Sequence, residues 1–360
     1  MNIASPLPTT VERTTMGHCT MRMSIFSVQD HYPTQARTVP ELYKQILAQA
    51  ELADQLGYDT FWVAEHHFHE YGAVPNPAIM LASIAQRTKR LRLGTAISIL
   101  TFHNPLTVAE SYAMVDILSD GRLMYGVGSG YLAHEFEGYA VDPAEKRDRF
   151  DETLAAVKQL LSGQRTSYTG KFRNFSNVKL NIEPVQKPIP IFVAVLRKEV
   201  AYYIGKQGNN LLCVPYASVD KFEDIADIIS EFRRGRAESG VPADDNSLAV
   251  ALHTHVAESD QKARETAESP FNLYVESRLY AKKSTYDDAM HNGLQLFGSV
   301  DTVARKLIAL KEMGVGHVMA LQNFGLLPQK HVHASMERMM KEVMPIANSE
   351  TNTKRAVACQ

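Results

Sequence analysis

The fold is decided by residues 58–71, which read Tyr-Asp-Thr-Phe-Trp-Val-Ala-Glu-His-His-Phe-His-Glu-Tyr. The first half, Tyr58 to Ala64, is rich in aromatic and β-branched residues and follows Gly57, which predicts a buried strand. The apolar run then gives way abruptly to Glu65 and a cluster of histidines. Because α/β proteins place their chemistry at the carboxyl ends of buried strands, this cluster is a candidate site. A polar loop with hydrogen-bonded histidines explains the spacing equally well.

The composition is that of an ordinary globular protein. The chain has 360 residues, of which 45% are hydrophobic and 22% are charged, and this length suffices for a large core. The net charge of −2 gives no reason to expect nucleic acid or an anionic membrane as a partner. No apolar run approaches the ~18 residues that a membrane-spanning helix needs.

The cysteines and the chain ends indicate a cytoplasmic protein with loose tails. Cys19, Cys213 and Cys359 are scattered and lack metal-ligand spacing, which fits a reducing compartment. The N-terminal stretch lacks the charged start and apolar core of a secretory signal. We expect a tail at 1–21, a single domain at 22–348 and a second tail at 349–360.

Strands and helices alternate along the whole chain. Short apolar stretches predict strands, and each is followed by sequence with helical periodicity. The predicted strands are 23–28, 58–64, 91–99, 122–127, 189–195, 211–214, 248–256 and 317–321. This alternation predicts an α/β protein, most economically a (β/α)8 TIM barrel, which leaves no sheet edge exposed. An open doubly wound sheet is the alternative.

Two segments depart from the alternation. Residues 166–189 contain Gly170 and two prolines and predict an inserted hairpin or irregular excursion. Residues 276–297 are polar and weakly periodic, which predicts a mobile loop after strand seven, on the active-site face of a barrel. Such a loop is a candidate lid over the site.

Several further motifs point to a ligand site but not to a metal. Residues 126–130, Gly-Val-Gly-Ser-Gly, have the wrong spacing for a dinucleotide fingerprint or a P-loop, yet let a backbone approach a flat ring or a phosphate. A tight turn is the alternative. Arg197 and Lys198 stand where strand five gives way to a helix, as a phosphate site or as two solvated charges. Arg147 lies in a charged lead into a helix, where solvated i,i+4 pairing is the commoner case. His66 and His67 point to opposite faces of a strand, so we expect no metal site.

Together these stretches resemble the bacterial luciferase-like family of flavin-dependent monooxygenases. The similarity runs from about Ile25 to Pro345, nearly the whole chain. It is carried by the segments 57–68 (GYDTFWVAEHHF), 93–96 (LGTA), 121–128 (GRLMYGVG), 298–301 (GSVD) and 343–345 (VMP). The resemblance implies a (β/α)8 barrel that binds FMN at the C-terminal ends of its strands. Such proteins use reduced FMN from a separate reductase and O2, form a 4a-hydroperoxyflavin and oxygenate an organic substrate.

The resemblance also implies roles for individual residues. His66 stands where the family needs an active-site base or acid near the flavin 4a position, and Glu65 is expected to orient it within the flavin site. Ala96-Ile97 falls where the family often has a non-prolyl cis peptide beneath the flavin ring. Gly128 is implied to lie against that ring.

Three more positions concern the flavin phosphate and its surroundings. Arg147 falls where luciferase has an arginine near the site. Ser129 stands where luciferase has a phosphate-binding arginine, so that ion pair cannot be made from this position. Leu196-Arg197 replaces the acidic residue and serine that are common after strand five. We expect Arg197 to take over phosphate binding, as a compensation by charge type.

The prediction is therefore a two-component monooxygenase that uses reduced FMN and O2 on a small organic substrate, with a separate flavin reductase. Helices 77–88 and 105–118 carry apolar residues on more than one face, and we expect a homodimer, with a heterodimer possible. One alternative is a deazaflavin-dependent hydride-transfer oxidoreductase, although residues 65–68 favour the FMN branch. A second alternative is a non-catalytic flavin-binding partner subunit, against which His66 argues.

Overall fold

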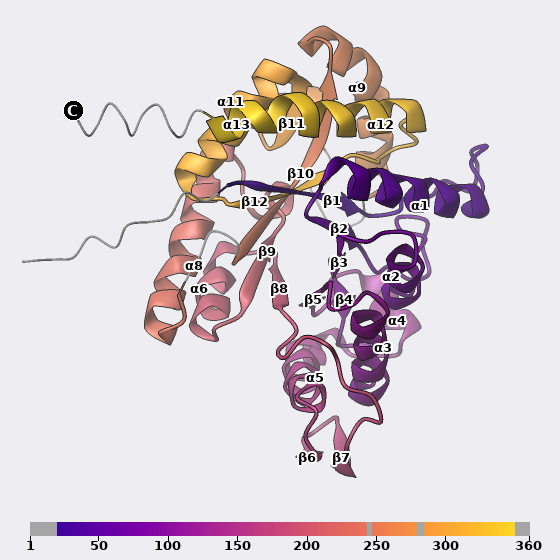
Figure 1. The fold of residues 1–360 in the computed structure, drawn as a ribbon, viewed down its shortest axis with the longest axis vertical. Helices are drawn as coiled ribbons and strands as arrows, with labels where there is room; N and C mark the ends of the chain where they lie inside the picture. The colour runs from indigo at the N-terminus through magenta and orange to yellow at the C-terminus, as the bar shows by residue number, and fades with distance from the viewer. Residues whose placement is uncertain (1–19, 243–246, 279–283, 350–360) are drawn as a thin grey trace, which may run out of the picture.

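The structure, a computed structural model, describes residues 20–242, 247–278 and 284–349. Its central feature is a closed ring of eight parallel strands (Figure 1). In order round the ring these are β1 (Arg22–Ser27), β2 (Thr60–Val63), β3 (Arg92–Thr95), β5 (Leu123–Gly128), β8 (Ile191–Val195), β9 (Asn210–Cys213), β10 (Leu248–Ala257) and β12 (His317–Leu321). β12 closes the ring beside β1, with Arg22 opposite His317. The predicted (β/α)8 TIM barrel is confirmed.

Helices surround the strands, as Figure 1 shows. The longer ones are α1 (Val39–Leu56), α2 (Pro77–Ala85), α3 (Pro105–Leu118), α5 (Lys146–Leu161), α6 (Lys198–Lys206), α8 (Ile225–Ser239), α9 (Asp260–Ser277), α11 (Val300–Met313) and α12 (Gln329–Arg338). Shorter elements are α4 (Ala133–Gly138), α7 (Pro215–Ser218), α10 (Tyr286–Asn292), α13 (Met344–Ser349), the 3-10 turns Pro143–Glu145 and Phe222–Asp224, and a π turn at Met339–Val343. Local sequence sets the ends. Thr38 caps the N-terminus of α1, and Gly57, at φ 84°, ends it in the left-handed region that favours glycine.

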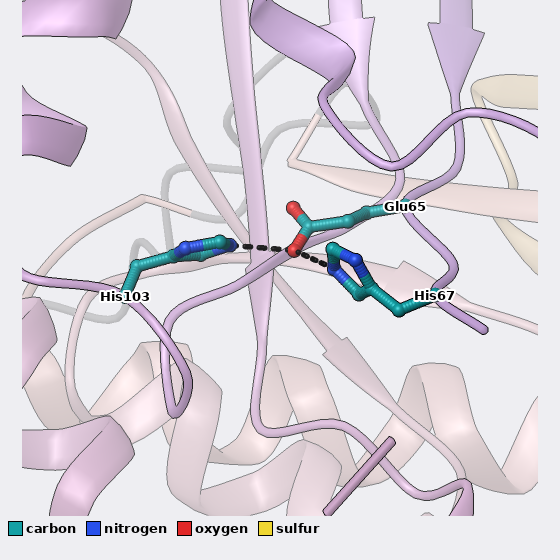
Figure 2. A group of neighbouring side chains, drawn as sticks. All are labelled: Glu65, His67 and His103. Carbon is teal, nitrogen blue, oxygen red and sulfur yellow. Dashed lines mark hydrogen bonds and ion pairs between the residues drawn. The ribbon is translucent and has the colours of Figure 1, made fainter. Parts of the chain in front are cut away.

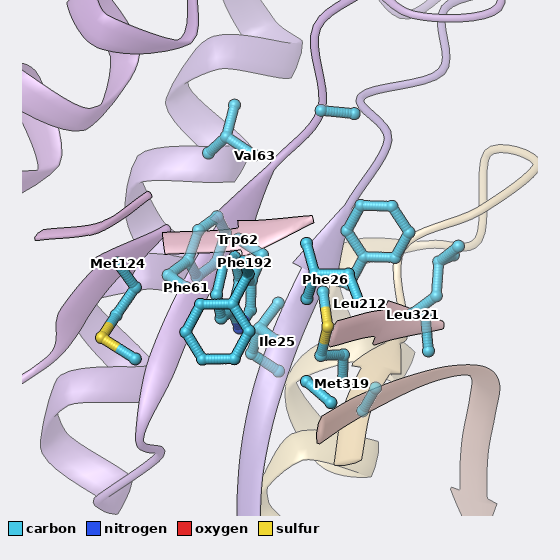
Figure 3. Packing of buried hydrophobic residues seen from close by; sticks show 14 of the residues in the cluster. Ile25, Phe26, Phe61, Trp62, Val63, Met124, Phe192, Leu212, Met319 and Leu321 are labelled. Carbon is cyan, nitrogen blue, oxygen red and sulfur yellow. The ribbon is translucent and has the colours of Figure 1, made fainter. Parts of the chain in front are cut away.

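The core forms where strand residues meet inside the barrel and beneath the helices (Figure 3). Trp62 of β2 is fully buried and meets Phe192 of β8 edge-on, with ring centres 5.5 Å apart. Gly94 on the neighbouring strand makes room for the indole, because a Cβ there would lie 2.2 Å from a Trp62 ring atom. Packing of this density favours one arrangement of the strands and so fixes where each carboxyl end lies.

The third strand is not continuous as predicted for residues 91–99. β3 ends at Thr95, and β4 (Ser98–Ile99) resumes beside β5, with Ser98 opposite Val127. Between them, the peptide bond from Ala96 to Ile97 is cis, as the resemblance implied. The ladder is interrupted between Thr95 and Ser98.

The two irregular segments differ in outcome. Residues 166–189 contain the antiparallel hairpin of β6 (Thr166–Thr169) and β7 (Asn174–Val178), which confirms the predicted insertion. Residues 276–297 are not one irregular loop, because α10 lies within them and β11 (Gln295–Ser299), which pairs with β10, begins there. Their polar sequence is that of a surface helix and a short strand, and residues 279–283 lie outside the described residues.

The predicted tails fall almost entirely outside the described residues, and the domain limits 22–348 stay a prediction. The described ends of the chain meet, since the backbone N–H of Met21 donates to Oδ1 of Asn348 at 3.0 Å. Throughout the described part of the chain, no helix combines the length and apolar character needed to cross a membrane.

Candidate active site

A cavity of about 530 Å³ opens at the carboxyl ends of the barrel strands. The residues that follow β2, β3, β5, β8 and β9 form its wall, which is where barrel enzymes assemble their sites. The eight sequence-predicted residues all line it: Glu65, His66, Ala96, Ile97, Gly128, Ser129, Arg147 and Arg197. The structure brings them together around one cavity, while their individual roles stay predictions.

His66 is held at the cavity wall by a buried glutamate that sequence reasoning missed. Its Nδ1 lies 3.2 Å from Oε1 of Glu135, on α4, and the same oxygen accepts the backbone N–H of His67 at 3.0 Å. Because this oxygen already accepts from the backbone of His67, the His66 tautomer that fits the contact donates from Nδ1. Nε2 then has no partner among the described residues and is available for a molecule in the cavity.

Two neighbours fix the orientation of the His66 ring. Tyr71 meets it edge-on, with ring centres 4.7 Å apart. Gly72 packs against it so closely that a Cβ would lie 2.7 Å from the ring carbon Cδ2. A ring that is clamped in this way presents one nitrogen in a fixed direction, which is what proton transfer requires.

Glu65 does not orient His66, contrary to the prediction. Its Oε1 accepts from Nε2 of His103 at 2.6 Å and from Nε2 of His67 at 3.0 Å (Figure 2). Its Oε2 accepts the backbone N–H of Ile99 at 3.2 Å. Side-chain alternation explains the correction, because residues 65 and 67 share one side of the chain and residue 66 takes the other.

The charges of this cluster support one another. Burial alone would raise the pKa of Glu65, but hydrogen bonds from His103 and His67 outweigh it and hold that pKa below its ordinary value. Burial would lower the pKa of His103, but the hydrogen bond to Glu65 and its charge raise it instead. The cluster is therefore a charge-assisted network that ties the ends of β2 and β4 to the segment before α3.

Glu65, His67 and His103 also form a donor set of the kind that binds metals, with ligand atoms within 4.8 Å of one another. The sequence had predicted no such set, because His103 is distant in the chain. The short contacts of 2.6 and 3.0 Å fit N–H···O bonds. Ligands of a tetrahedral zinc ion would lie roughly 3.3 Å apart, given bonds of about 2.0–2.1 Å. This geometry favours the hydrogen-bonded network.

The floor of the cavity is made by small groups. Gly128 at the end of β5 packs on Ile97, because a Cβ at position 128 would lie 2.2 Å from Cδ1 of Ile97. The end of the Ile97 side chain therefore occupies the space that a side chain at position 128 would need. The result is a surface against which a flat ring can lie.

The mouth of the cavity is basic. Lys146 and Arg147 begin α5, and Arg197 directly precedes α6. Nε of Arg147 also donates to Oδ2 of Asp151 at 2.8 Å, in an exposed i,i+4 pair that matches the alternative interpretation of this residue. The only acidic residue among the described lining is Glu65, which is engaged elsewhere. A phosphate fits this end of the cavity by charge.

Comparison with known proteins identifies relatives over nearly the whole chain. The family model described as luciferase-like monooxygenase matches residues 21–317. The chain is 27% identical over 358 residues to the oxygenase component of flavin-dependent trigonelline monooxygenase from Acinetobacter baylyi, covering 93% of this chain and 98% of that protein. It is 24% identical over 278 residues to an F420-dependent glucose-6-phosphate dehydrogenase from Amycolatopsis mediterranei, covering 75% and 81%. Among solved structures, monooxygenase RslO1 from Streptomyces bottropensis matches with a TM-score of 0.84 and 27% identity, over 90% of this chain and 99% of that one.

Proposed function

Because the chain belongs to the luciferase-like monooxygenase family and is an oxidoreductase, we propose that it uses reduced FMN and O2 to oxygenate a small organic substrate. The observation that carries this proposal is the cavity at the strand ends, where His66, Ile97, Gly128 and the basic mouth converge. Its volume of about 530 Å³ lies within the range of small-molecule sites. Reduced FMN, when bound, would supply the electrons that activate O2.

The residues present fit FMN. The surface formed by Gly128 and Ile97 would receive the flat ring system, with the Ile97 side chain packed against the glycine. The cations of the mouth would hold the phosphate, with the N-terminus of α6 adding partial positive charge. His66, which keeps its proton on Nδ1 through Glu135, would use Nε2 to accept or donate a proton during turnover.

A separate flavin reductase is part of the proposal. The sequence contains no recognisable nicotinamide-binding unit, and the relative from Acinetobacter baylyi is named as an oxygenase component. The purified protein with FMN should therefore oxidise NADH only slowly until a reductase is added. Brisk NADH oxidation by the chain alone would contradict the two-component proposal.

Substrate-dependent O2 consumption tests the reaction itself. The protein is supplied with reduced FMN by a reductase and screened against organic compounds, with products identified by mass spectrometry. The F420-dependent relative makes hydride transfer with a deazaflavin the second candidate. Turnover with reduced F420 and none with reduced FMN would establish that candidate, and tight flavin binding without turnover in either assay would indicate a non-catalytic subunit.

The phosphate role proposed for Arg197 can be tested without a substrate. Arg197→Ala should weaken FMN binding by about one to two orders of magnitude, because charge-assisted hydrogen bonds contribute roughly 1.5–3 kcal/mol. Riboflavin, which lacks the phosphate, should bind both proteins alike. Arg149→Ala is the matched control, since this arginine pairs with Glu145 at 2.9 Å and is not among the residues that line the cavity, and it should leave FMN binding unchanged. Equal losses for FMN and riboflavin would show that Arg197 acts through packing instead.

We propose in addition that two copies of the chain pair through α2 and α3. These helices expose large apolar side chains, with Ile79 67% and Met114 53% exposed. Exposed apolar groups on adjacent helices mark interaction surfaces. Light scattering should give the mass of a dimer, and Met114→Lys should shift it toward a monomer. A monomer for the unaltered chain at micromolar concentration would contradict the proposal.

A further inference from the structure

The inserted hairpin of β6 and β7 returns along α5 from the end of the helix toward its beginning (Figure 1). The hydroxyl of Thr166, at the start of β6, donates to Oε1 of Gln159 at 3.0 Å, near the C-terminus of α5. The turn of the hairpin, residues 170–173, which we call the strap, contacts Glu152 near the N-terminus of the same helix. The strap therefore lies at the end of α5 that forms part of the cavity mouth.

Glu152 anchors the strap to α5. Its Oε1 accepts the backbone N–H of Lys171 at 2.7 Å. Its Oε2 accepts the backbone N–H groups of Phe172 and Arg173 at 2.9 and 3.2 Å. Burial would raise the pKa of Glu152, but these hydrogen bonds outweigh it and hold that pKa below its ordinary value. Arg149 adds a contact with the Phe172 ring, at 4.3 Å from its centre, but the backbone of the strap is held by the carboxylate.

The strap reaches the cavity wall through Thr101. Nη2 of Arg173 donates to the carbonyl oxygen of Thr101 at 3.4 Å, and its Nε donates to Oγ1 of Thr153 at 3.3 Å. The hydroxyl of Thr101, which is fully buried, donates to the carbonyl oxygen of Ser129 at 2.9 Å and lies 3.3 Å from that of Lys146. Ser129 and Lys146 both line the cavity. Thr101 thus joins the strap, the end of β5 and the start of α5.

We propose that the strap positions the basic mouth of the cavity for the phosphate of FMN, with Glu152 and Thr101 as its anchors. Lys146 and Arg147 are exposed cations of the mouth, and both belong to the first turn of α5. An exposed cation binds a phosphate better when its backbone is already fixed, because less conformational freedom is lost on binding. Glu152 and Thr101 act through these residues and are positioning residues. The inference rests on the proposed function, since it assumes that FMN places its phosphate at the mouth.

The test compares FMN with riboflavin, which lacks the phosphate. Glu152→Gln replaces one carboxylate oxygen by an amide NH2 group, which cannot accept a backbone N–H, and so should loosen the strap. FMN binding should weaken by about threefold to tenfold, the range that one ordinary hydrogen bond contributes, while riboflavin binding stays unchanged. Both affinities are measured by titration of flavin fluorescence. Equal losses for the two ligands, or no loss for FMN, would overturn the proposal.

The charge change in this variant works against the expected result. Removing a negative charge near the mouth would by itself strengthen the binding of a phosphate, so a loss of FMN affinity points to position and not to charge. Glu183→Gln is the matched control, because Glu183 belongs to the same insertion but pairs with Lys179 and Lys187 at 3.0 and 2.6 Å. It should leave the binding of both ligands unchanged. A selective loss of FMN affinity in this control as well would overturn the role of Glu152.

Thr101→Val tests the other anchor. It keeps the shape of the side chain and removes the hydroxyl, and it should reproduce the selective loss of FMN affinity. The double variant of Glu152→Gln and Thr101→Val should lose less than the product of the two single losses, because both residues act through one chain of contacts. A fully multiplicative loss would show two independent effects and overturn the strap as one device. A lowered melting temperature with an unchanged ratio of FMN to riboflavin affinity would show that the hairpin serves stability alone.

The result can be separated from the tests of the proposed function. If Arg197→Ala weakens FMN and riboflavin binding alike, the phosphate site assigned to the mouth is wrong. If Arg197→Ala is selective for FMN and Glu152→Gln is not, only the strap is wrong. Because the titrations need no turnover, failure of the oxygenation assay would leave their outcome unaffected.

Discussion

His66 and His67 are neighbours in the chain, and each contacts a buried glutamate. The two histidines differ in whether a ring nitrogen remains available to a ligand. His66 bonds through Nδ1 to Glu135 at 3.2 Å, and its other nitrogen has no partner in the described structure. His67 bonds through Nε2 to Glu65 at 3.0 Å, and its Nδ1 lies 3.2 Å from the hydroxyl of Tyr139. Burial and a carboxylate partner therefore do not distinguish them. The distinguishing features are a free nitrogen and its access to the cavity.

The same difference extends to the surroundings. His66 lines the cavity, whereas His67 does not, and the pair of His67 with Glu65 is extended by His103 into a closed network. A closed network has little capacity left for a ligand but ties loops together. We therefore expect changes at His66 to act on the reaction and changes at His67 to act on the free energy of unfolding.

The largest effect is expected for His66→Ala. Product formation should fall by about 10²–10⁴-fold, because positioned proton transfer typically contributes that factor. FMN affinity and the melting temperature should stay close to those of the unaltered protein. The measurement is substrate-dependent O2 consumption together with a flavin titration. Near-normal turnover in this variant would remove His66 from the mechanism.

His67→Ala should show the reverse pattern. Loss of its bond to the charged Glu65 should lower the free energy of unfolding by about 1.5–3 kcal/mol, as for other hydrogen bonds to charged groups. Turnover of the folded protein should change only a few-fold. Urea unfolding and O2 consumption, measured on the same samples, separate the two quantities. An inactive but fully stable variant would mean that His67, and not His66, faces the reaction.

Glu135→Gln tests whether His66 and Glu135 act as a unit. The neutral amide accepts a weaker hydrogen bond from Nδ1, so the orientation of His66 should loosen and turnover should fall about tenfold to a hundredfold. That fall corresponds to roughly 1.4–2.7 kcal/mol. Glu137→Gln, an exposed change on the same helix, is the control. A loss of FMN affinity equal to the loss of turnover would indicate a structural role for Glu135.

The sequence predicted the scaffold through its local pattern, whereas most of the residues at the cavity were implied by the family resemblance. Strand alternation and the abrupt end of the segment 58–64 predicted the barrel and the position of His66. Glu135 lay beyond reach, since it is 69 residues from His66 and nothing in the polar surroundings of α4 indicates a buried carboxylate.

One error was avoidable. Adjacency in the chain suggested that Glu65 orients His66, but the alternation that separates His66 from His67 also places Glu65 with His67. The prediction of an irregular loop at residues 276–297 was wrong for another reason. Their polar side chains hide the short helix α10 and the edge strand β11, which the neighbouring β10 stabilises through backbone pairing.

The smallest expected effect is a pH dependence of the free energy of unfolding, and it arises from the network of Glu65, His67 and His103. The lowered pKa of Glu65 means that its stabilisation is present above the ordinary value of 4.5 and is lost as the pH falls through the folded-state pKa. The raised pKa of His103 means that its stabilisation is present below the ordinary value of 6.5 and is lost as the pH rises through the folded-state pKa.

The two limits define a window from pH 4.5 to pH 6.5, in which the Glu65–His103 ion pair contributes fully to the free energy of unfolding. His103→Gln should lower the free energy of unfolding by about 1 kcal/mol within this window, a modest value because His103 is partly exposed. The difference between the two proteins should shrink on either side, as urea unfolding at a series of pH values would measure. A difference that is constant with pH would show that His103 stabilises the protein by packing and not by its charge. The network of Glu65, His67 and His103 would then not differ from the His66–Glu135 pair in its electrostatics.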